Sequence, residues 1–123
     1  MNYVEIDKTG AVIIDKTNMA ELPVTAGTSL MGQVETTYKT ILEAFGEPNG
    51  DSDGYKTDVE WTIQTPNGVA TIYNWKDGHN YCGEDGLDVW DITDWHIGGH
   101  NREVVSWVEK VLAMARESIE TIA

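Results

Sequence analysis

The sequence predicts an α+β fold in which a short, mainly antiparallel sheet packs against two amphipathic helices, with a β-hairpin at the N-terminus. Two observations support this fold class. Apolar and polar residues alternate strictly before a Pro66-Asn67-Gly68 turn, and a second run rich in β-forming residues follows it, which is typical of a hairpin. Two other segments carry apolar residues at helical spacing. With 123 residues, 41% of them hydrophobic, the chain predicts a single domain, residues 1–123.

The first half of the chain predicts a hairpin followed by a helix. Residues 3–6 and 11–14 are rich in β-forming side chains and are joined through Lys8-Thr9-Gly10, so we expect a small edge ribbon. After a polar stretch, Thr28 or Ser29 is a good N-cap for a helix, and Gly46 with Pro48 would end it. The apolar face of this helix would consist of Leu30, Val34, Tyr38, Ile41, Leu42 and Phe45.

The second half predicts three strands and a long helix. The alternation of Val59, Trp61 and Ile63 gives one strand of the central hairpin, and residues 69–76 give the other. A third strand is expected at residues 92–97, after a glycine-containing loop. The last helix would begin near Asn101, which is a good cap. Its apolar positions recur every three or four residues, at Val104, Val105, Val108, Val111, Leu112, Ala115 and Ile119.

Acidic residues dominate the charge of the chain. It has 21 Asp plus Glu against 8 Lys plus Arg, which gives a formal net charge of −13. A field of that sign repels a phosphate backbone, so we expect no direct binding of DNA or RNA. Between Lys76 and Arg102 there are six carboxylates and no basic residue. This stretch either keeps the protein soluble or imitates nucleic acid on the basic groove of another protein.

Nothing in the sequence predicts secretion or a membrane span. No basic segment followed by an apolar one begins at Met1, and no apolar run approaches about 18 residues. The single Cys82 excludes an intrachain disulfide and fits a reducing compartment. We therefore expect a cytoplasmic protein.

Residues 70–78 and 94–101 hold an unusual density of aromatic rings, histidines and amides. Strand alternation puts Tyr73 and Trp75 on one face, and Asp94 and His96 on one face of the next strand, so a suitable register would unite them in one rim. A Gly98-Gly99 turn would then lead into a helix N-terminus that attracts anions. The candidate ligand-binding residues are Tyr73, Asn74, Trp75, Lys76, Asp94, Trp95, His96, His100 and Arg102.

Such a set suits a nucleotide-type ligand, because rings stack on a base and donors at a helix N-terminus hold a phosphate. Two other interpretations stay open: Trp75 and Trp95 are structural wedges between sheet and helix, or the rim binds a protein. Evidence for catalysis is thin, since nothing like an activated nucleophile surrounds Cys82. The chain also lacks a P-loop, a dinucleotide fingerprint and an H-E-x-x-H motif. We predict a binding protein without catalytic residues or cofactor.

Two patterns have the spacing of metal sites, although we predict no metal ligands. Residues 49–60 match a calcium loop, with oxygen ligands at alternate positions, glycine at the sixth and Glu60 at the twelfth. Against calcium, Asn49 takes the first position and Lys56 an apolar one. A zinc set is the other alternative, and its members would be His79, Cys82, His96 and His100.

A series of spaced motifs runs over residues 28–112. They are Thr28-Ser29-Leu30-x-Gly32, Thr37-Tyr38, Phe45-Gly46-Glu47-Pro48, Trp61, Ala70-Thr71-Ile72-Tyr73-x-Trp75-Lys76 and Trp95-His96-Ile97-Gly98-Gly99. In this order they resemble a family of small accessory proteins encoded by tailed bacteriophages. The resemblance implies a phage origin, and by analogy small phage proteins of this kind often inhibit host defence.

Two functions follow as hypotheses. In the first, a non-enzymatic counter-defence protein in the host cytoplasm sequesters a small nucleotide-type immune signal, as a homo-oligomer. In the second, an acidic decoy of anti-CRISPR or anti-restriction type blocks a nucleic-acid-binding host defence protein through the carboxylates of residues 51–60 and 84–94. An accessory role in phage replication or morphogenesis is a third alternative.

Overall fold

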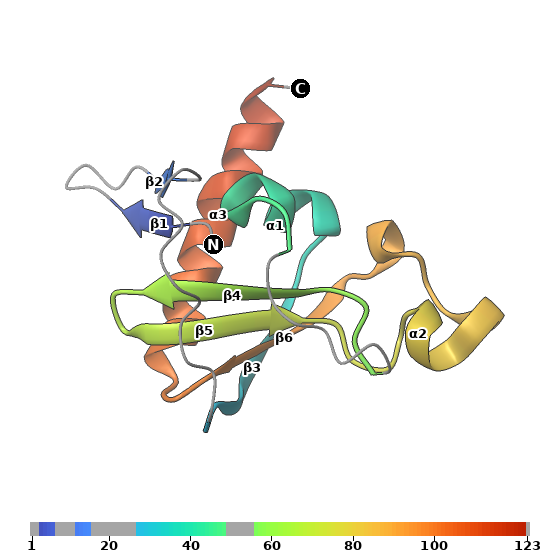
Figure 1. The fold of residues 1–123 in the computed structure, drawn as a ribbon. Helices are drawn as coiled ribbons and strands as arrows, with labels where there is room; N and C mark the ends of the chain where they lie inside the picture. Colours follow the sequence, from blue (N-terminus) through green and yellow to red (C-terminus); the bar gives the residue numbers. More distant parts are fainter. Residues whose placement is uncertain (1–2, 7–11, 16–26, 49–55, 123) are drawn as a thin grey trace.

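The computed structural model describes residues 3–6, 12–15, 27–48 and 56–122, and the side chains of residues 27–48 and 56–119. It has an α+β fold with a four-stranded antiparallel sheet in the order β3-β6-β5-β4 (Figure 1). The strands are β3 (Ser29–Glu35), β4 (Glu60–Thr65), β5 (Gly68–Tyr73) and β6 (Asp94–Gly99).

Helices α1 (Tyr38–Phe45) and α3 (Glu103–Ile122) both lie on one side of this sheet (Figure 1). At one end of the sheet, the short helix α2 (His79–Cys82) and the 3-10 turns η1 (Gly83–Asp85) and η2 (Val89–Asp91) project away from it. We call residues 78–91 the α2–η2 lobe. Among the residues that the structure describes, no helix is long and apolar enough to cross a bilayer.

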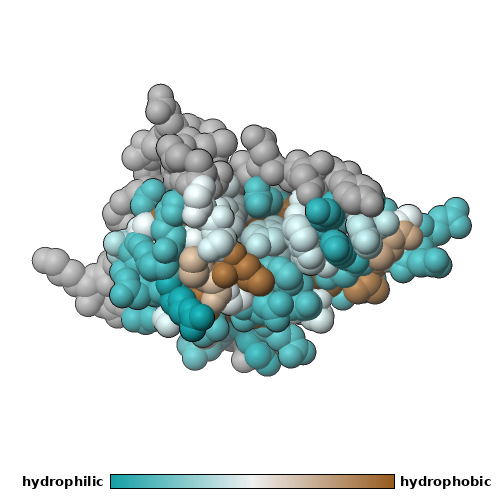
Figure 2. Space-filling model, turned by 90° about the horizontal axis from the view of Figure 1, so that it is seen from below, coloured by the Kyte–Doolittle hydropathy of each residue, from teal (hydrophilic) through white to brown (hydrophobic). Residues whose placement is uncertain are grey.

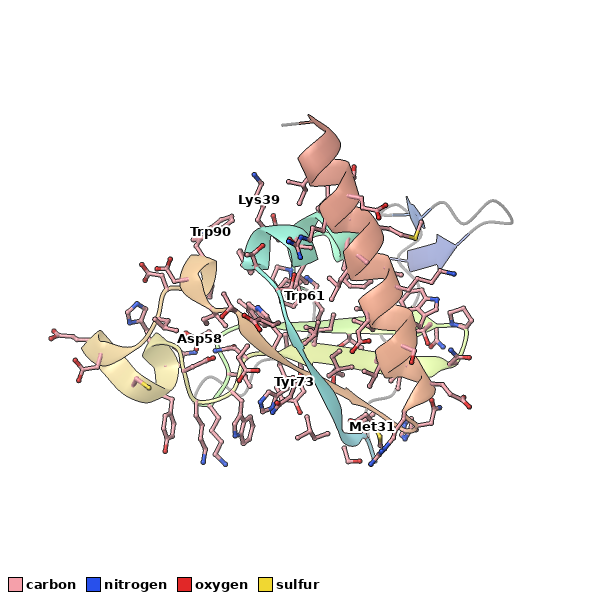
Figure 3. All side chains as sticks on the ribbon, turned by 180° about the vertical axis from the view of Figure 1, so that it is seen from behind. Met31, Lys39, Asp58, Trp61, Tyr73 and Trp90 are labelled. Atoms are coloured by element: carbon pink, nitrogen blue, oxygen red, sulfur yellow. The ribbon has the colours of Figure 1, made fainter. Side chains whose placement is uncertain are left out.

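The hydrophobic core fills the space between the sheet and the two larger helices. Ile72 of β5 and Trp95 and Ile97 of β6 are fully buried there. Trp61 of β4 also points toward the helices (Figure 3), and its indole Nε1 donates a hydrogen bond of 2.9 Å to the carbonyl of Gly46. Each such side chain contributes about 1.5–3 kcal/mol by leaving water. The core therefore fixes which face of each strand remains outside.

The predicted helix from Thr28 or Ser29 to Phe45 is wrong in its first half. Residues 29–35 form β3, which pairs with β6, and the helix begins only after Thr37, whose side chain accepts from the backbone N–H of Thr40 at 3.2 Å. Pairing with β6 gives β3 its backbone hydrogen bonds, and Gly32 lets the strand lie against Val105 of α3. A long-range interaction therefore overrides the helical spacing. The predicted end at Gly46 is confirmed.

The other central elements are confirmed with shifted ends. β4 and β5 form the expected hairpin, although β5 stops at Tyr73 instead of Lys76. The third strand lies two residues later than predicted, so Gly98 and Gly99 belong to β6 and make no turn. Asn101 precedes α3 as expected, and its Oδ1 accepts the backbone N–H of Glu103 at 3.0 Å.

At the N-terminus, β1 (Tyr3–Ile6) and β2 (Val12–Asp15) pair in antiparallel register. The connection at residues 7–11 lies outside the described residues, so the hairpin through Lys8-Thr9-Gly10 stays a prediction.

Candidate functional site

Three rings meet on the outer face of the sheet, which is the face away from α1 and α3. Tyr73 and His96 are register partners on β5 and β6, with ring centroids 5.6 Å apart. Trp75, just past the end of β5, lies 6.1 Å from the Tyr73 ring and 6.2 Å from the His96 ring, and it is nearly parallel to His96. Figure 3 shows Tyr73 on this outer side. We call Tyr73, Trp75 and His96 the aromatic platform; the register between β5 and β6, which the sequence left open, brings these three rings together.

Two of the eight basic residues converge on Trp75. The ammonium of Lys56 lies 5.4 Å from the centroid of the Trp75 ring, and that of Lys76 lies 5.8 Å from it. Lys76 also lies 5.5 Å from the ring of Tyr81 in α2. Positive charge is therefore concentrated beside the platform of a protein that is acidic as a whole.

The backbone around Trp75 is sharply bent. Lys76 has a φ of 59°, in the left-handed region that non-glycine residues seldom adopt, and its N–H donates to the carbonyl of Lys56 at 2.7 Å. Strained residues of this kind cluster at functional sites. The bend ends β5 and brings both lysines to the same ring.

A buried asparagine holds this bend in place. Asn74 is fully buried, and its Oδ1 accepts the backbone N–H groups of Asp58 and Val59 at 2.7 and 3.2 Å. Its Nδ2 donates to Oδ1 of Asp58 at 2.9 Å and to Oδ1 of Asp77 at 3.0 Å. Asn74 thus ties the segment before β4 to the segment after β5, and with them Lys56 and Lys76.

The two carboxylates that accept from Asn74, those of Asp58 and Asp77, lie close to each other. Burial raises the pKa of Asp77, the hydrogen bond from Asn74 opposes this, and the negative charges of Asp94 and Asp58 raise the pKa further. Asp58 lies where the α2–η2 lobe joins the sheet (Figure 3). Its Oδ2 accepts the backbone N–H of Asn80 at 3.3 Å, so the same carboxylate also anchors the lobe.

Two side chains of the α2–η2 lobe make the contacts that hold it together. His79 bonds within the lobe, and Cys82 bonds to the bend at Lys76. His79 Nδ1 lies 2.7 Å from the carbonyl oxygen of Gly83, and its Nε2 lies 2.6 Å from Oδ1 of Asp88. The Gly83 carbonyl first and the Asp88 carboxylate second raise the pKa of His79. The thiol of Cys82 donates to the carbonyl of Lys76 at 3.2 Å. The thiol contact therefore ties the lobe to the bend at Lys76.

A pocket of about 240 Å³ opens next to the platform on the same face. Trp75 and Tyr73 line one part of it, and Gly98 another. Glu60, the register partner of Tyr73, also lines it. Hydroxyl-bearing residues complete the lining, namely Thr28, Ser29, Thr57 and Thr71. Seen from this side, the described surface is mostly hydrophilic with small hydrophobic patches (Figure 2).

Four of the predicted site residues lie elsewhere, and a fifth is at the edge. Asn74 and Trp95 are fully buried on the core side; the indole of Trp95 donates to the carbonyls of Thr36 and Ile92 at 3.2 Å each. His100 and Arg102 lie beyond the opposite end of β6, four or more residues past His96, which is roughly 13 Å or more of extended chain. Asp94 is exposed at the start of β6, and its negative charge contributes to raising the pKa of Asp77.

The predicted anion site at the start of α3 is therefore not part of the platform. Gly98 and Gly99 are strand residues, Asn101 already caps the helix, and Glu103 places a negative charge in its first turn. Both features weaken the attraction of an anion to that helix end.

Neither metal pattern gains support from the described residues. Among them, no three His, Cys, Asp or Glu side chains come together in a group that could hold a metal ion, so the four residues of the zinc alternative do not assemble. Most of the calcium-like pattern, residues 49–55, lies outside the described residues, and that alternative stays untested.

Lys56, Glu60 and the hydroxyl residues are part of the site although the sequence did not predict them. Most of them come from the start of β3, from β4 and from the segment before β4, while Thr71 belongs to β5, and the pairing of the strands brings them together. For Glu60 a signal existed, because alternation with Trp61 places it on the outer face.

Comparisons with protein-family models, curated proteins and solved structures each gave no match. The resemblance to phage-encoded proteins therefore stays a prediction that rests on the motifs alone.

Proposed function

We propose that this protein is a non-enzymatic, phage-encoded counter-defence protein that binds and sequesters a small nucleotide-type immune signal at the aromatic platform. The observation that carries the binding part is the convergence of Lys56 and Lys76 on Trp75, beside a parallel His96 ring. The phage origin and the role in counter-defence rest on the motif resemblance.

The chemistry of the platform favours an aromatic anion. Stacking a base on an aromatic side chain contributes about 1–3 kcal/mol and tolerates any base. A lysine over an exposed ring gains only about 0.5–1 kcal/mol, so the contact with Trp75 itself costs Lys56 or Lys76 little to exchange for a phosphate. Carboxylates farther than about 8 Å from the phosphate are largely screened at physiological salt. Local donors can therefore hold an anion on a protein with a net charge of −13.

Sequestration fits a binding protein because it requires affinity and copy number, without turnover. The proposal includes a homo-oligomer in the host cytoplasm, where each copy would offer one platform. It assigns no catalytic role to Cys82, whose thiol is hydrogen-bonded to a backbone carbonyl.

A thermal unfolding screen tests the proposal. The wild-type protein is melted with cyclic mononucleotides, cyclic dinucleotides and cyclic ADP-ribose isomers. A ligand at 100 times its Kd stabilises the fold by about 2.7 kcal/mol, enough for a clear rise in Tm. Trp75→Ala should abolish the rise, whereas Trp90→Ala, which removes an exposed tryptophan from the α2–η2 lobe, should keep it. No rise with any ligand, or a rise that survives in Trp75→Ala, would contradict the proposal.

A second candidate function, the acidic decoy, is favoured by the α2–η2 lobe. Trp90 is 61% exposed, and the same lobe exposes Glu84, Asp85, Asp88 and Asp91. An exposed tryptophan on a lobe that carries four carboxylates suits a basic partner surface. If the decoy is right, binding to a host nuclease weakens steeply with salt, and Asp85→Asn with Asp91→Asn releases it. Binding that is insensitive to salt would exclude this candidate.

A further inference from the structure

The pocket beside the platform differs from the platform in its chemistry. The polar part of its lining consists of hydroxyl groups and one carboxylate, and no Lys or Arg is among the described residues that line it. Such a lining repels a phosphate and suits a polyol, because hydroxyls donate and accept while a carboxylate only accepts. The two lysines lie at its Trp75 side, so anionic and hydroxyl-bearing parts of one ligand would be separated.

The size of the pocket sets a limit on what enters. Its volume of about 240 Å³ is below the roughly 300–1,000 Å³ that is usual for a whole ligand. A sugar ring fits where a complete nucleotide does not. Gly98 keeps the pocket open, since a Cβ at this position would lie 2.5 Å from Oγ1 of Thr71.

Glu60 is the carboxylate of this pocket. It alternates with the buried Trp61 and pairs with Tyr73, so it stands on the outer face beside the platform. The effect of its charge on Tyr73 supports this proximity: burial first and Glu60 second raise the pKa of the Tyr73 phenol. Tyr73 thus keeps its proton and remains a hydrogen-bond donor at the border between pocket and platform.

We propose that this pocket binds the ribose of a ribonucleotide, with the carboxylate of Glu60 accepting hydrogen bonds from the vicinal 2′- and 3′-hydroxyls. The inference rests on the proposed function and specifies its ligand class. The base then stacks on Trp75 and the phosphate meets Lys56 and Lys76. Two carboxylate oxygens match two neighbouring hydroxyl donors, and hydrogen bonds to a charged group change affinity by a factor of roughly ten or more. Glu60 is therefore the residue that selects ribonucleotides over deoxyribonucleotides.

Calorimetric titration with three probes tests the inference: adenosine 5′-monophosphate, its 2′-deoxy analogue and its 2′,3′-dideoxy analogue. Adenine serves because stacking tolerates any base. We expect the ribonucleotide to bind the wild type at least about tenfold more tightly than the dideoxy analogue. In Glu60→Gln this ratio should fall toward one, while the dideoxy analogue binds as well or better because a negative charge is gone. Glu43→Gln, which removes an exposed carboxylate from α1, should keep the wild-type ratio.

The outcomes separate the two proposals. If all three nucleotides bind the wild type equally, or if the preference survives in Glu60→Gln, the ribose inference is wrong. Nucleotide binding at the aromatic platform is then not contradicted. If none of the three binds the wild type, the ribose inference is wrong, and the thermal screen with cyclic nucleotides decides separately whether the platform binds nucleotides at all. Binding of the dideoxy analogue by Glu60→Gln also shows that the variant is folded.

Discussion

Trp75 and His96 stand almost parallel, with ring centroids 6.2 Å apart and ring planes inclined by 21°. One residue follows β5 and the other belongs to β6, so strand pairing holds them in this position. Tyr73, two residues before Trp75, is the register partner of His96. The residue between Tyr73 and Trp75 in sequence is the buried Asn74. The platform is therefore formed before any ligand arrives, which lowers the entropic cost of binding.

Replacing Asn74 by alanine should destabilise the protein strongly. The change leaves the backbone N–H groups of Asp58 and Val59 without their acceptor and removes the donor that two carboxylates share. We expect a loss of roughly 2–4 kcal/mol in the free energy of unfolding, measured by urea denaturation. Asn67→Ala in the exposed hairpin turn should change it by less than about 0.5 kcal/mol. A similarly small loss in Asn74→Ala would refute the structural role given to Asn74.

Replacing Asp77 by asparagine should stabilise the protein at neutral pH. The pKa of Asp77 is raised in the folded state by burial and by nearby carboxylates. Its contribution to stability is therefore fully present below the unfolded pKa of about 3.9 and is lost as the pH rises through the folded-state pKa. An asparagine avoids this loss, and its carbonyl oxygen can still accept from Asn74.

Urea denaturation at two pH values measures the effect. Asp77→Asn should exceed the wild type in stability at pH 7, and the difference should shrink as the pH falls toward about 4. Asp91→Asn, on the exposed η2 turn, is the control for the change in net charge. If Asp77→Asn is the less stable protein at neutral pH, the carboxylate is stabilising and the assigned cause of its pKa shift is incorrect.

The sequence predicts those elements whose own apolar pattern shows which face is buried. The alternation around Trp61 and the spacing of the apolar residues of α3 arise because each element buries one face in the same hydrophobic core. Both elements were therefore predicted correctly. β3 was missed because Leu30 and Val34 happen to fall at helical spacing with the residues of α1. The strand exists through its pairing with β6, which includes a register shift between Leu30 and Gly32. Such pairing is a long-range property that local spacing does not contain.

The site was predictable in part for the same reason. Alternation places Tyr73 and Trp75 on one face of their strand, and Asp94 and His96 on one face of the next, but it leaves the register between the two strands open. The same alternation places Asn74 and Trp95 on the opposite, core side, where both are fully buried, so their own sequence positions argue against contact with a ligand on the platform. Lys56 and the pocket hydroxyls other than Thr71 come from other segments. Their position depends on the strand order and on the bend at Lys76, which the sequence does not reveal.

The indole N–H signals of the five tryptophans test the central claim most directly. In ¹H–¹⁵N correlation spectra, the wild-type protein is titrated with the nucleotide that raises its Tm most. We predict that the Trp75 signal moves on saturation, while those of the buried Trp61 and Trp95 and of the distant, exposed Trp90 stay in place. A saturable change at Trp90 with no change at Trp75 would contradict the account, because the ligand would then bind the α2–η2 lobe and not the aromatic platform.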